Sequence, residues 1–184
     1  MLLRPSEHER TLFMRRLSSV AFNRNLIAQD ALDWGADALL WIDSDQTFPT
    51  NALERVAGLH VDIVGCNYGT RTDPPSPTAH DLNGERVWPD EAAAKRGDIK
   101  EVGALGLGFC LIRRSVFESV ERPWFIDAAS RDGSRIITED VHFMDRAREA
   151  GHKVHLDCFL SEHIGHVTER LLFLRDVRAS SSPM

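Results

Sequence analysis

Several features that would mark a special class of protein are missing from this sequence. No apolar run reaches about 18 residues, the length that crosses a bilayer, so no transmembrane segment is expected. Residues 1–16 are charged throughout and contain no apolar core, which argues against a secretory signal. Clustered Lys and Arg are also absent and the net charge is −6, so the composition does not favour non-specific binding to nucleic acid.

Cysteine is scarce as well. The three cysteines, Cys66, Cys110 and Cys158, are far apart, form no CxxC pair and each lie among apolar residues. A structural zinc site built on cysteine is therefore not expected, and an HExxH zinc motif is missing too. We expect reduced core thiols in a cytoplasmic protein.

The remaining composition is that of an ordinary globular chain. Of the 184 residues, 42% are hydrophobic and 27% are charged, which excludes disordered and fibrous classes. This length suits one domain, which we expect over residues 1–178, followed by a flexible tail at 179–184.

The hydrophobic pattern predicts alternating helices and strands. Apolar residues at spacings of 3 and 4 indicate a helix over residues 20–34, which Gly35 ends. The proline-rich residues 70–98 indicate a long loop outside the core. The other expected elements are strands at 36–42 and 60–69, a helix at 50–59, a strand, bend, strand and helix over 101–120, a helix at 138–150, a strand at 153–160 and a helix at 166–177. This order is typical of an α/β fold with a mixed sheet.

Two carboxylates, Asp43 and Asp45, directly follow the apolar run ALLWI. Residues two apart in an extended segment point the same way, so these groups repel each other unless a cation lies between them. Hard divalent cations such as Mg²⁺ and Mn²⁺ take oxygen ligands and often share them with a phosphate. The pair therefore predicts a metal clamp for a diphosphate. The alternative is that Asp43 or Asp45 caps the helix that follows Pro49.

A second acidic pair, Glu139 and Asp140, stands at the start of the helix predicted from Thr138. Acids in a first turn compensate the helix dipole, and that explanation is sufficient for the pair taken alone. A carboxylate at a helix start beneath a pocket can instead act as a general base toward a hydroxyl nucleophile.

Two histidines, His163 and His166, lie in the segment EHIGH after the last predicted strand. An imidazole can complete a metal site that carboxylates begin, and a surface or hydrogen-bonded core histidine is the alternative.

The glycines of GALGLGF, residues 103–109, do not open a helix after a first strand, so they are not a dinucleotide-binding fingerprint. They predict either a plain strand bend or a close approach of the backbone to a ligand.

These segments occur in an order that resembles the GT-A nucleotide-sugar glycosyltransferases, particularly the compact, family-2-like members of bacterial and phage type. ALLWIDSDQTFP resembles their DXD segment, VGALGLGFCLIRRSVFE the segment that lines the donor-sugar and acceptor pocket, TEDVHFMDRAREAGHKV their ED segment, and SEHIGH their late histidine segment. The similarity runs from about Phe22 to His166. It implies a GT-A-like (Rossmann-like), mixed and mostly parallel sheet flanked by helices.

The resemblance also implies an activity, the metal-dependent transfer of a sugar from a nucleotide-sugar, first of all a UDP-sugar, to an acceptor hydroxyl. In this scheme Asp45 would ligate Mn²⁺ or Mg²⁺, and Asp43 would contact the ribose, or the metal through water. His163 would be the late contact to the metal or diphosphate, with His166 as its substitute if the register differs.

The remaining implied roles concern the acceptor and the nucleotide. Asp140, with Glu139 beside it, would be the base that takes a proton from the acceptor hydroxyl in an inverting displacement. Four further residues would lie near the nucleotide-sugar, namely Arg24, Asn25, Gly106 and Gly108.

The sequence departs from the family pattern before the metal motif. The first 20 residues do not resemble the strand that usually begins the sheet, so we expect a fold shortened at its N-terminus. The base-binding half of the site would then be shortened, supplied by a partner subunit or a second copy, or absent. The sequence contains no clear QxxRW-type segment near its C-terminus, so it does not indicate processive polymer synthesis.

Two other functions remain open from sequence, a non-catalytic GT-A-like domain that binds a nucleotide-sugar or a partner, and a nucleotidyltransferase. The acceptor of a transferase could be a glycan, a protein, a lipid or a modified nucleobase.

Overall fold

The computed structural model describes residues 10–16, 19–130, 132–168 and 171–173 as a mixed α/β fold. The predicted tail at 179–184 lies outside the described residues. The helices are α1 (Val20–Trp34), α2 (Ala52–Gly58), α3 (Glu91–Arg96), α4 (Arg114–Ser119), α5 (Glu139–Glu149) and α6 (Cys158–Ser161). The strands are β1 (Ala38–Ile42), β2 (Gln46–Thr47), β3 (Ile63–Gly65), β4 (Ile99–Val102), β5 (Phe109–Arg113), β6 (Ala128–Ala129), β7 (Ile136–Ile137), β8 (Val154–Asp157), β9 (Gly165–Val167) and β10 (Leu171–Phe173).

The central sheet has five strands in the order β1-β5-β3-β8-β4. Only the β3–β8 pair is parallel, while β1–β5, β3–β5 and β4–β8 are antiparallel. The expectation of a mostly parallel sheet is therefore wrong, because β5 inserts between β1 and β3 in the opposite direction. Since β1, β3 and β8 still run the same way, their carboxyl ends and the start of β5 meet at one edge of the sheet.

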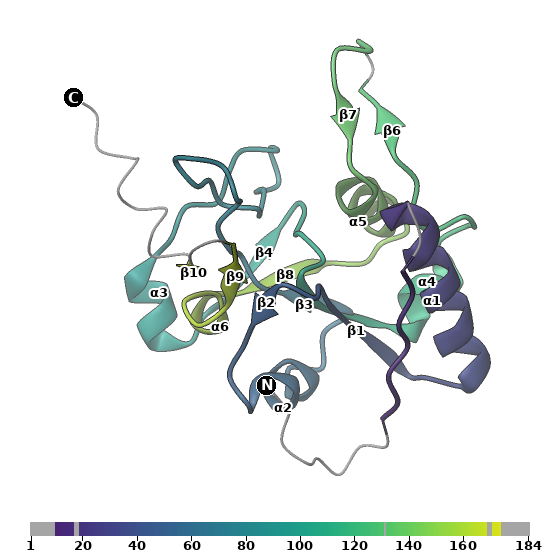
Figure 1. The fold of residues 1–184 in the computed structure, drawn as a ribbon, viewed down its shortest axis with the longest axis horizontal. Coiled ribbons are helices and arrows are strands. Elements are labelled where there is room, and N and C mark those ends of the chain that lie inside the picture. Colours follow the sequence, from purple (N-terminus) through teal and green to yellow (C-terminus); the bar gives the residue numbers. More distant parts are fainter. Residues whose placement is uncertain (1–9, 17–18, 131, 169–170, 174–184) are drawn as a thin grey trace.

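Both faces of this sheet are covered, as Figure 1 shows. Alternation along β5 sends Cys110 and Ile112 into a core shared with α1, α4 and α5, and sends Phe109 and Leu111 into a core shared with α2 and α6. A strand buried on both faces is continuously apolar, and this explains why the sequence pattern there lacks a clean alternation.

The two longest helices follow their local signals. Ser19 caps α1 by accepting a hydrogen bond from the N–H of Phe22, and Gly35 ends it with a φ of 95°, which favours glycine. Two acids occupy the first turn of α5, and Gly151 follows its end with a φ of 94°. Both helices were expected at these positions.

Three other expectations are wrong. Residues 158–160, expected at the end of a strand over 153–160, belong to helix α6, because Asp157 caps that helix by accepting from the N–H of Leu160. Residues 166–168 and 171–173, expected within a helix over 166–177, lie largely in strands β9 and β10, and 174–177 are outside the described residues. The segment 70–98, expected to lie outside the core, contains α3, whose Ala93 and Ala94 are buried. Asp90 caps α3 by accepting from the N–H of Ala93, and small alanine side chains let this short helix pack closely.

A second, smaller sheet has the order β10-β9-β2 and lies beside the edge where β1 ends. It pairs Gln46 with His166, 120 positions later in the chain, and the N–H of Val167 donates to the carbonyl of Asp45 at 2.7 Å. The hairpin of β6 and β7 projects from the body next to α5 (Figure 1). No helix in the described ranges combines the length and apolarity that crossing a membrane requires.

Candidate functional site

The predicted site residues lie mainly at the edge where β1 ends and β5 begins. The N–H of Asp43 donates to the carbonyl of Gly108 at 3.0 Å, which ties the DSD segment to the glycine-rich segment. Neither carboxylate of DSD caps the next helix, because the N-cap of α2 is Asn51. The capping alternative for this motif is therefore excluded, and its side chains contact other groups.

Arg24 of α1 connects the two acidic motifs. Its Nη1 lies 2.7 Å from Oε1 of Glu139 and its Nη2 lies 3.2 Å from Oδ1 of Asp43. The arginine side chain is 8% exposed and that of Glu139 is 12% exposed, so this is a largely buried pair. Burial raises the pKa of Glu139, and the positive charge of Arg24 opposes that rise. A single guanidinium therefore fixes the start of α5 relative to the end of β1.

Asp140 lies next to this ion pair at the first turn of α5. Its Oδ1 accepts from the hydroxyl of Thr138 and from the N–H of Val141, the latter at 2.8 Å. The backbone N–H of Glu139 donates to Asp127 at 3.1 Å. The helix start is thus held from both sides, and the carboxylate of Asp140 remains partly exposed.

Asp45 contacts a different pair of residues. An oxygen of its carboxylate, Oδ2, pairs with the guanidinium of Arg71 and lies 3.4 Å from Nε2 of His166. Arg71 also donates from Nε to the same Nε2 at 3.1 Å. The arginine belongs to the loop that follows β3, and its side chain is 55% exposed.

The hydrogen bonds of His166 fix its tautomer. Its Nδ1 lies 3.0 Å from the carbonyl oxygen of Gly69, which can only accept, so Nδ1 carries the hydrogen. Nε2 accepts from Arg71 and therefore presents a lone pair next to the oxygen of Asp45. Two lone-pair donors thus converge on one cation, the guanidinium of Arg71. A backbone carbonyl that holds the second ring nitrogen is also the usual partner of a metal-ligating histidine.

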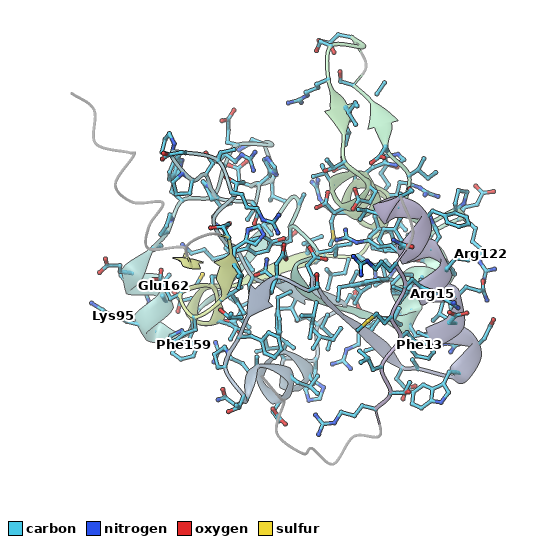
Figure 2. The ribbon with its side chains drawn as sticks, in the orientation of Figure 1. Phe13, Arg15, Lys95, Arg122, Phe159 and Glu162 are labelled. Carbon is cyan, nitrogen blue, oxygen red and sulfur yellow. The ribbon has the colours of Figure 1, made fainter. Side chains whose placement is uncertain are left out.

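His163 lies elsewhere. It is exposed, its Nδ1 faces the carbonyl of Phe159 at 2.9 Å, and its ring packs against that of Phe159 at 4.6 Å between centroids. Figure 2 shows Phe159 on the outer side of α6. The structure therefore brings His166, and not His163, to Asp45.

Tyr68 is buried between His166 and the glycine bend. Its ring packs edge-on against His166, and its hydroxyl accepts the N–H of Gly108 at 3.0 Å. Burial raises the pKa of Tyr68, and the negative charges of Asp43 and Asp140 raise it further, so the phenol stays protonated. The geometric link between the two acidic motifs remains Arg24, whose guanidinium contacts both Glu139 and Asp43.

The glycines of the bend make room for this tyrosine. A Cβ on Gly106 would lie 2.4 Å from the Tyr68 hydroxyl oxygen, and one on Gly108 would lie 2.6 Å from that oxygen and 2.7 Å from Nε2 of Gln46. The close approach predicted from the glycines is therefore an approach to side chains of this chain. The buried amide of Gln46 has no hydrogen-bond partner among the described residues.

Asn25, expected near the nucleotide, has its amide fully engaged in holding the chain. Its Nδ2 donates to the carbonyls of Ala21 and Phe125, and its Oδ1 accepts the N–H groups of Trp124 and Phe125. An amide offers two donors and two acceptor positions, so this one has no capacity left for a ligand.

Sequence reasoning missed Arg71, Tyr68 and Gln46. Tyr68 comes three residues after the end of β3, at the same edge as Asp43, and this position was the available signal. Arg71 gave no such signal, because it lies in the proline-rich segment whose path only the tertiary structure defines.

Two side chains of the site, Asp45 and His166, have the chemistry to ligate a metal and lie side by side. Among the side chains that the structure describes, no three His, Cys, Asp or Glu residues come together as a metal-binding group. Asp45 and His166 therefore form a pair, and further ligands would have to come from a substrate or from water. Mg²⁺ is commonly bound in this way, through one or two protein carboxylates together with substrate phosphates, and Asp45 would be the carboxylate here.

Comparisons with known proteins show the fold alone. No protein-family model matches the chain, and no curated protein sequence matches it. A solved structure with a similar fold is the crystal structure of A197 from STIV. It superposes with a TM-score of 0.61 at 19% sequence identity, over 88% of this chain and 79% of that chain. The chain thus shares its mixed α/β architecture with A197.

Proposed function

We propose that this protein is a metal-dependent glycosyltransferase with a GT-A-like fold, which transfers a sugar from a nucleotide-sugar to an acceptor hydroxyl. One observation carries the proposal. The carboxylate of Asp45 and the lone pair of His166 converge on one cation position, at the same sheet edge as the acidic start of α5. The order of the four sequence motifs supports it independently.

The residues present fit a divalent cation such as Mn²⁺ or Mg²⁺. Oδ2 of Asp45 and Nε2 of His166 are 3.4 Å apart. The carboxylate oxygen is the ligand type that both ions prefer, and the imidazole nitrogen would be the secondary protein ligand. When bound, such a cation neutralises the charge that develops on the leaving diphosphate. Asp43 lies two residues before Asp45 and is half exposed, and in this proposal it would contact a ribose hydroxyl of the donor.

Asp140 is the proposed general base. It accepts the proton of the acceptor hydroxyl while the hydroxyl oxygen forms a bond to the anomeric carbon of the donor. The bond from that carbon to the diphosphate oxygen breaks, and the diphosphate leaves with the electron pair. Glu139 is held by Arg24, so its role is to orient the helix start, and the proton passes to Asp140.

A non-catalytic role is the second candidate, and one observation favours it. Both carboxylates of the DSD segment are already paired with guanidinium groups of the chain, Asp43 with Arg24 and Asp45 with Arg71. A domain of this kind would bind a nucleotide-sugar or a partner without turnover. The nucleotidyltransferase alternative would instead consume a nucleoside triphosphate.

The deciding experiment is a screen of nucleotide-sugars for transfer and hydrolysis, with Mn²⁺ present and with EDTA. We expect Mn²⁺-dependent release of nucleoside diphosphate from one donor, lost in Asp45→Ala and strongly reduced in His166→Ala. His163→Ala is the matched control and should keep the parental rate, because that ring packs on Phe159 away from Asp45. Binding of a donor without any product would favour the non-catalytic role, and consumption of a nucleoside triphosphate would favour nucleotidyl transfer.

A further inference from the structure

Arg71 occupies the position at which the proposed metal would bind. Its guanidinium pairs with Oδ2 of Asp45 and donates to Nε2 of His166, which are the two protein ligands of the proposed site. The arginine thus makes both of the contacts that a divalent cation would make. The sequence motifs gave it no role.

This arrangement and metal binding exclude each other. Nε2 of His166 offers one lone pair, which Arg71 uses in the present structure and which a metal ion would need. A divalent cation at Oδ2 of Asp45 would also repel a guanidinium that contacts the same oxygen. Arg71 must therefore leave Asp45 and His166 before a metal can be ligated by both.

The loop that carries Arg71 allows the side chain to move without unfolding. The base of the loop is closed by backbone pairing, since the N–H of Thr70 donates to the carbonyl of Ser76 at 2.8 Å. The N–H of Ser76 also donates to the Thr70 hydroxyl at 2.9 Å. Only the long side chain of Arg71, which is 55% exposed, reaches across to Asp45. Rotation of that side chain is sufficient to release the two ligands.

The released guanidinium would remain beside the metal-bound anion. A planar guanidinium with several N–H donors matches the oxygens of a phosphate group, and such charge-assisted hydrogen bonds are stronger than neutral ones. The diphosphate of the donor is the anion that the proposed function brings to this position. Arg71 would therefore exchange a carboxylate partner for a phosphate partner.

We propose that Arg71 is a binding residue for the donor diphosphate, and that in the absence of metal it serves as the counter-cation of Asp45 and His166. This inference rests on the proposed function. It gives the residue two effects of opposite sign, because Arg71 competes with the metal and cooperates with the diphosphate.

The test compares the parent with Arg71→Ala in two titrations. Free Mn²⁺ is measured by electron paramagnetic resonance without nucleotide, and UDP binding is measured by calorimetry at saturating Mn²⁺. We expect Arg71→Ala to bind Mn²⁺ about three- to tenfold more tightly, since it removes a competing ion pair. We expect it to bind UDP about tenfold more weakly, since it removes a charge-assisted hydrogen bond.

Arg96→Ala is the matched control. Arg96 is also an exposed arginine paired with an aspartate, Asp98, and its loss changes the net charge by the same amount. It should alter neither affinity, which separates the local effect of Arg71 from the overall charge. Asp45→Ala should lose Mn²⁺ binding in the same assay.

The outcomes separate this inference from the function on which it rests. If the parent and Arg71→Ala bind Mn²⁺ equally, or bind UDP equally, the role of Arg71 is overturned. The metal site is still upheld in that case if Asp45→Ala loses Mn²⁺ binding. Mn²⁺ binding that Asp45→Ala retains, or an absence of binding in every variant, overturns both proposals. Binding of Mn²⁺ by Arg71→Ala when the parent binds none supports the counter-cation role, and weaker UDP binding completes the assignment.

Discussion

The guanidinium of Arg24 lies 2.7 Å from the carboxylate of Glu139, although the two residues are 115 positions apart in the sequence. This ion pair joins the first helix to the start of α5, and a second contact from the same guanidinium reaches Asp43. A buried arginine thus fixes the distance between the proposed base and the proposed donor site.

We expect Arg24→Met to destabilise the fold by about 3 kcal/mol, because it leaves the buried carboxylate of Glu139 without its counter-charge. Urea unfolding monitored by circular dichroism measures the loss. Arg15→Met is the control. Arg15 lies on the segment that precedes α1 and pairs with Asp30 of that helix (Figure 2). Because this ion pair is partly exposed to solvent, its loss should cost about 1 kcal/mol or less. Equal losses in the two variants would contradict the importance of the buried pair. The double variant Arg24→Met/Glu139→Gln should recover part of the stability.

Gly106→Ala should destabilise the protein by about 1 to 3 kcal/mol, because the added methyl would lie 2.4 Å from the hydroxyl oxygen of Tyr68. Adding Tyr68→Phe removes that oxygen and should restore part of the loss, which thermal unfolding of the double variant measures. Gly58→Ala is the control. It has open space around it at the end of α2 and should leave stability unchanged or raise it by up to about 1 kcal/mol. If Gly106→Ala is as stable as the parent and its tyrosine fluorescence is unchanged, the bend has free space next to the Tyr68 hydroxyl, and the prediction is wrong.

Asp140→Asn should slow sugar transfer by about 10² to 10⁴, since it removes the proposed general base, while donor binding stays close to that of the parent. Steady-state kinetics with the donor found in the screen, together with calorimetry for binding, separates the two effects. Asp145→Asn, a half-exposed position on the same helix, provides the matched control and should retain the parental rate. Turnover of Asp140→Asn at the parental rate would exclude this carboxylate as the base.

The three thiols should react slowly in the native state. Burial raises the pKa of Cys66, Cys110 and Cys158, so less thiolate is present at pH 8 than in an unfolded chain. A disulfide reagent, which reacts with the thiolate form, should label the native protein far more slowly than the protein in urea. Rapid labelling of even one thiol in the native state would show that its position is open to solvent.

Asp90 should contribute a pH-dependent part of the stability. The Lys100 ammonium, 2.6 Å away, and then the N–H of Ala93 lower its pKa from 3.8 to about 2. A carboxyl whose folded pKa is depressed stabilises the fold above its unfolded pKa, and this contribution is lost as the pH falls through the folded value. The parent should therefore exceed Asp90→Asn in stability at pH 5, and the difference should vanish as the pH falls from 4 to 2. Lys100→Met should reduce the size of this pH dependence. A difference that stays constant over that interval would contradict the assignment.

Much of the local structure could be predicted because its signals are local. Helix α1 has its apolar spacing and Gly35, and α5 has Thr138, two acids and Gly151 within or beside its own residues. The helix α3 was missed although Asp90 and Gly97, its two caps, were visible in the sequence. The prolines around it favoured the interpretation as a loop.

The metal motif shows what tertiary structure decided. The sequence alone placed Asp43 and Asp45 at the end of a buried strand, because an apolar run followed by acids is a local pattern. The choice of His166 over His163 depends on the pairing of β9 with β2, which is a contact between distant segments. A backbone hydrogen bond of this kind overrides the helical tendency of the residues after His166, since strand formation depends on neighbours more than on propensity.

The same division holds for the whole site. Residue type and spacing determined which side chains have the chemistry, namely two acidic pairs, a glycine bend and a late histidine. Only the packing of the folded chain decided the direction of β5, the close approach of Tyr68 to Gly106, and the contacts of Arg24 and Arg71 with the acids. Those contacts join residues far apart in sequence, and their free energy exists only once the sheet and its covering helices have brought them together.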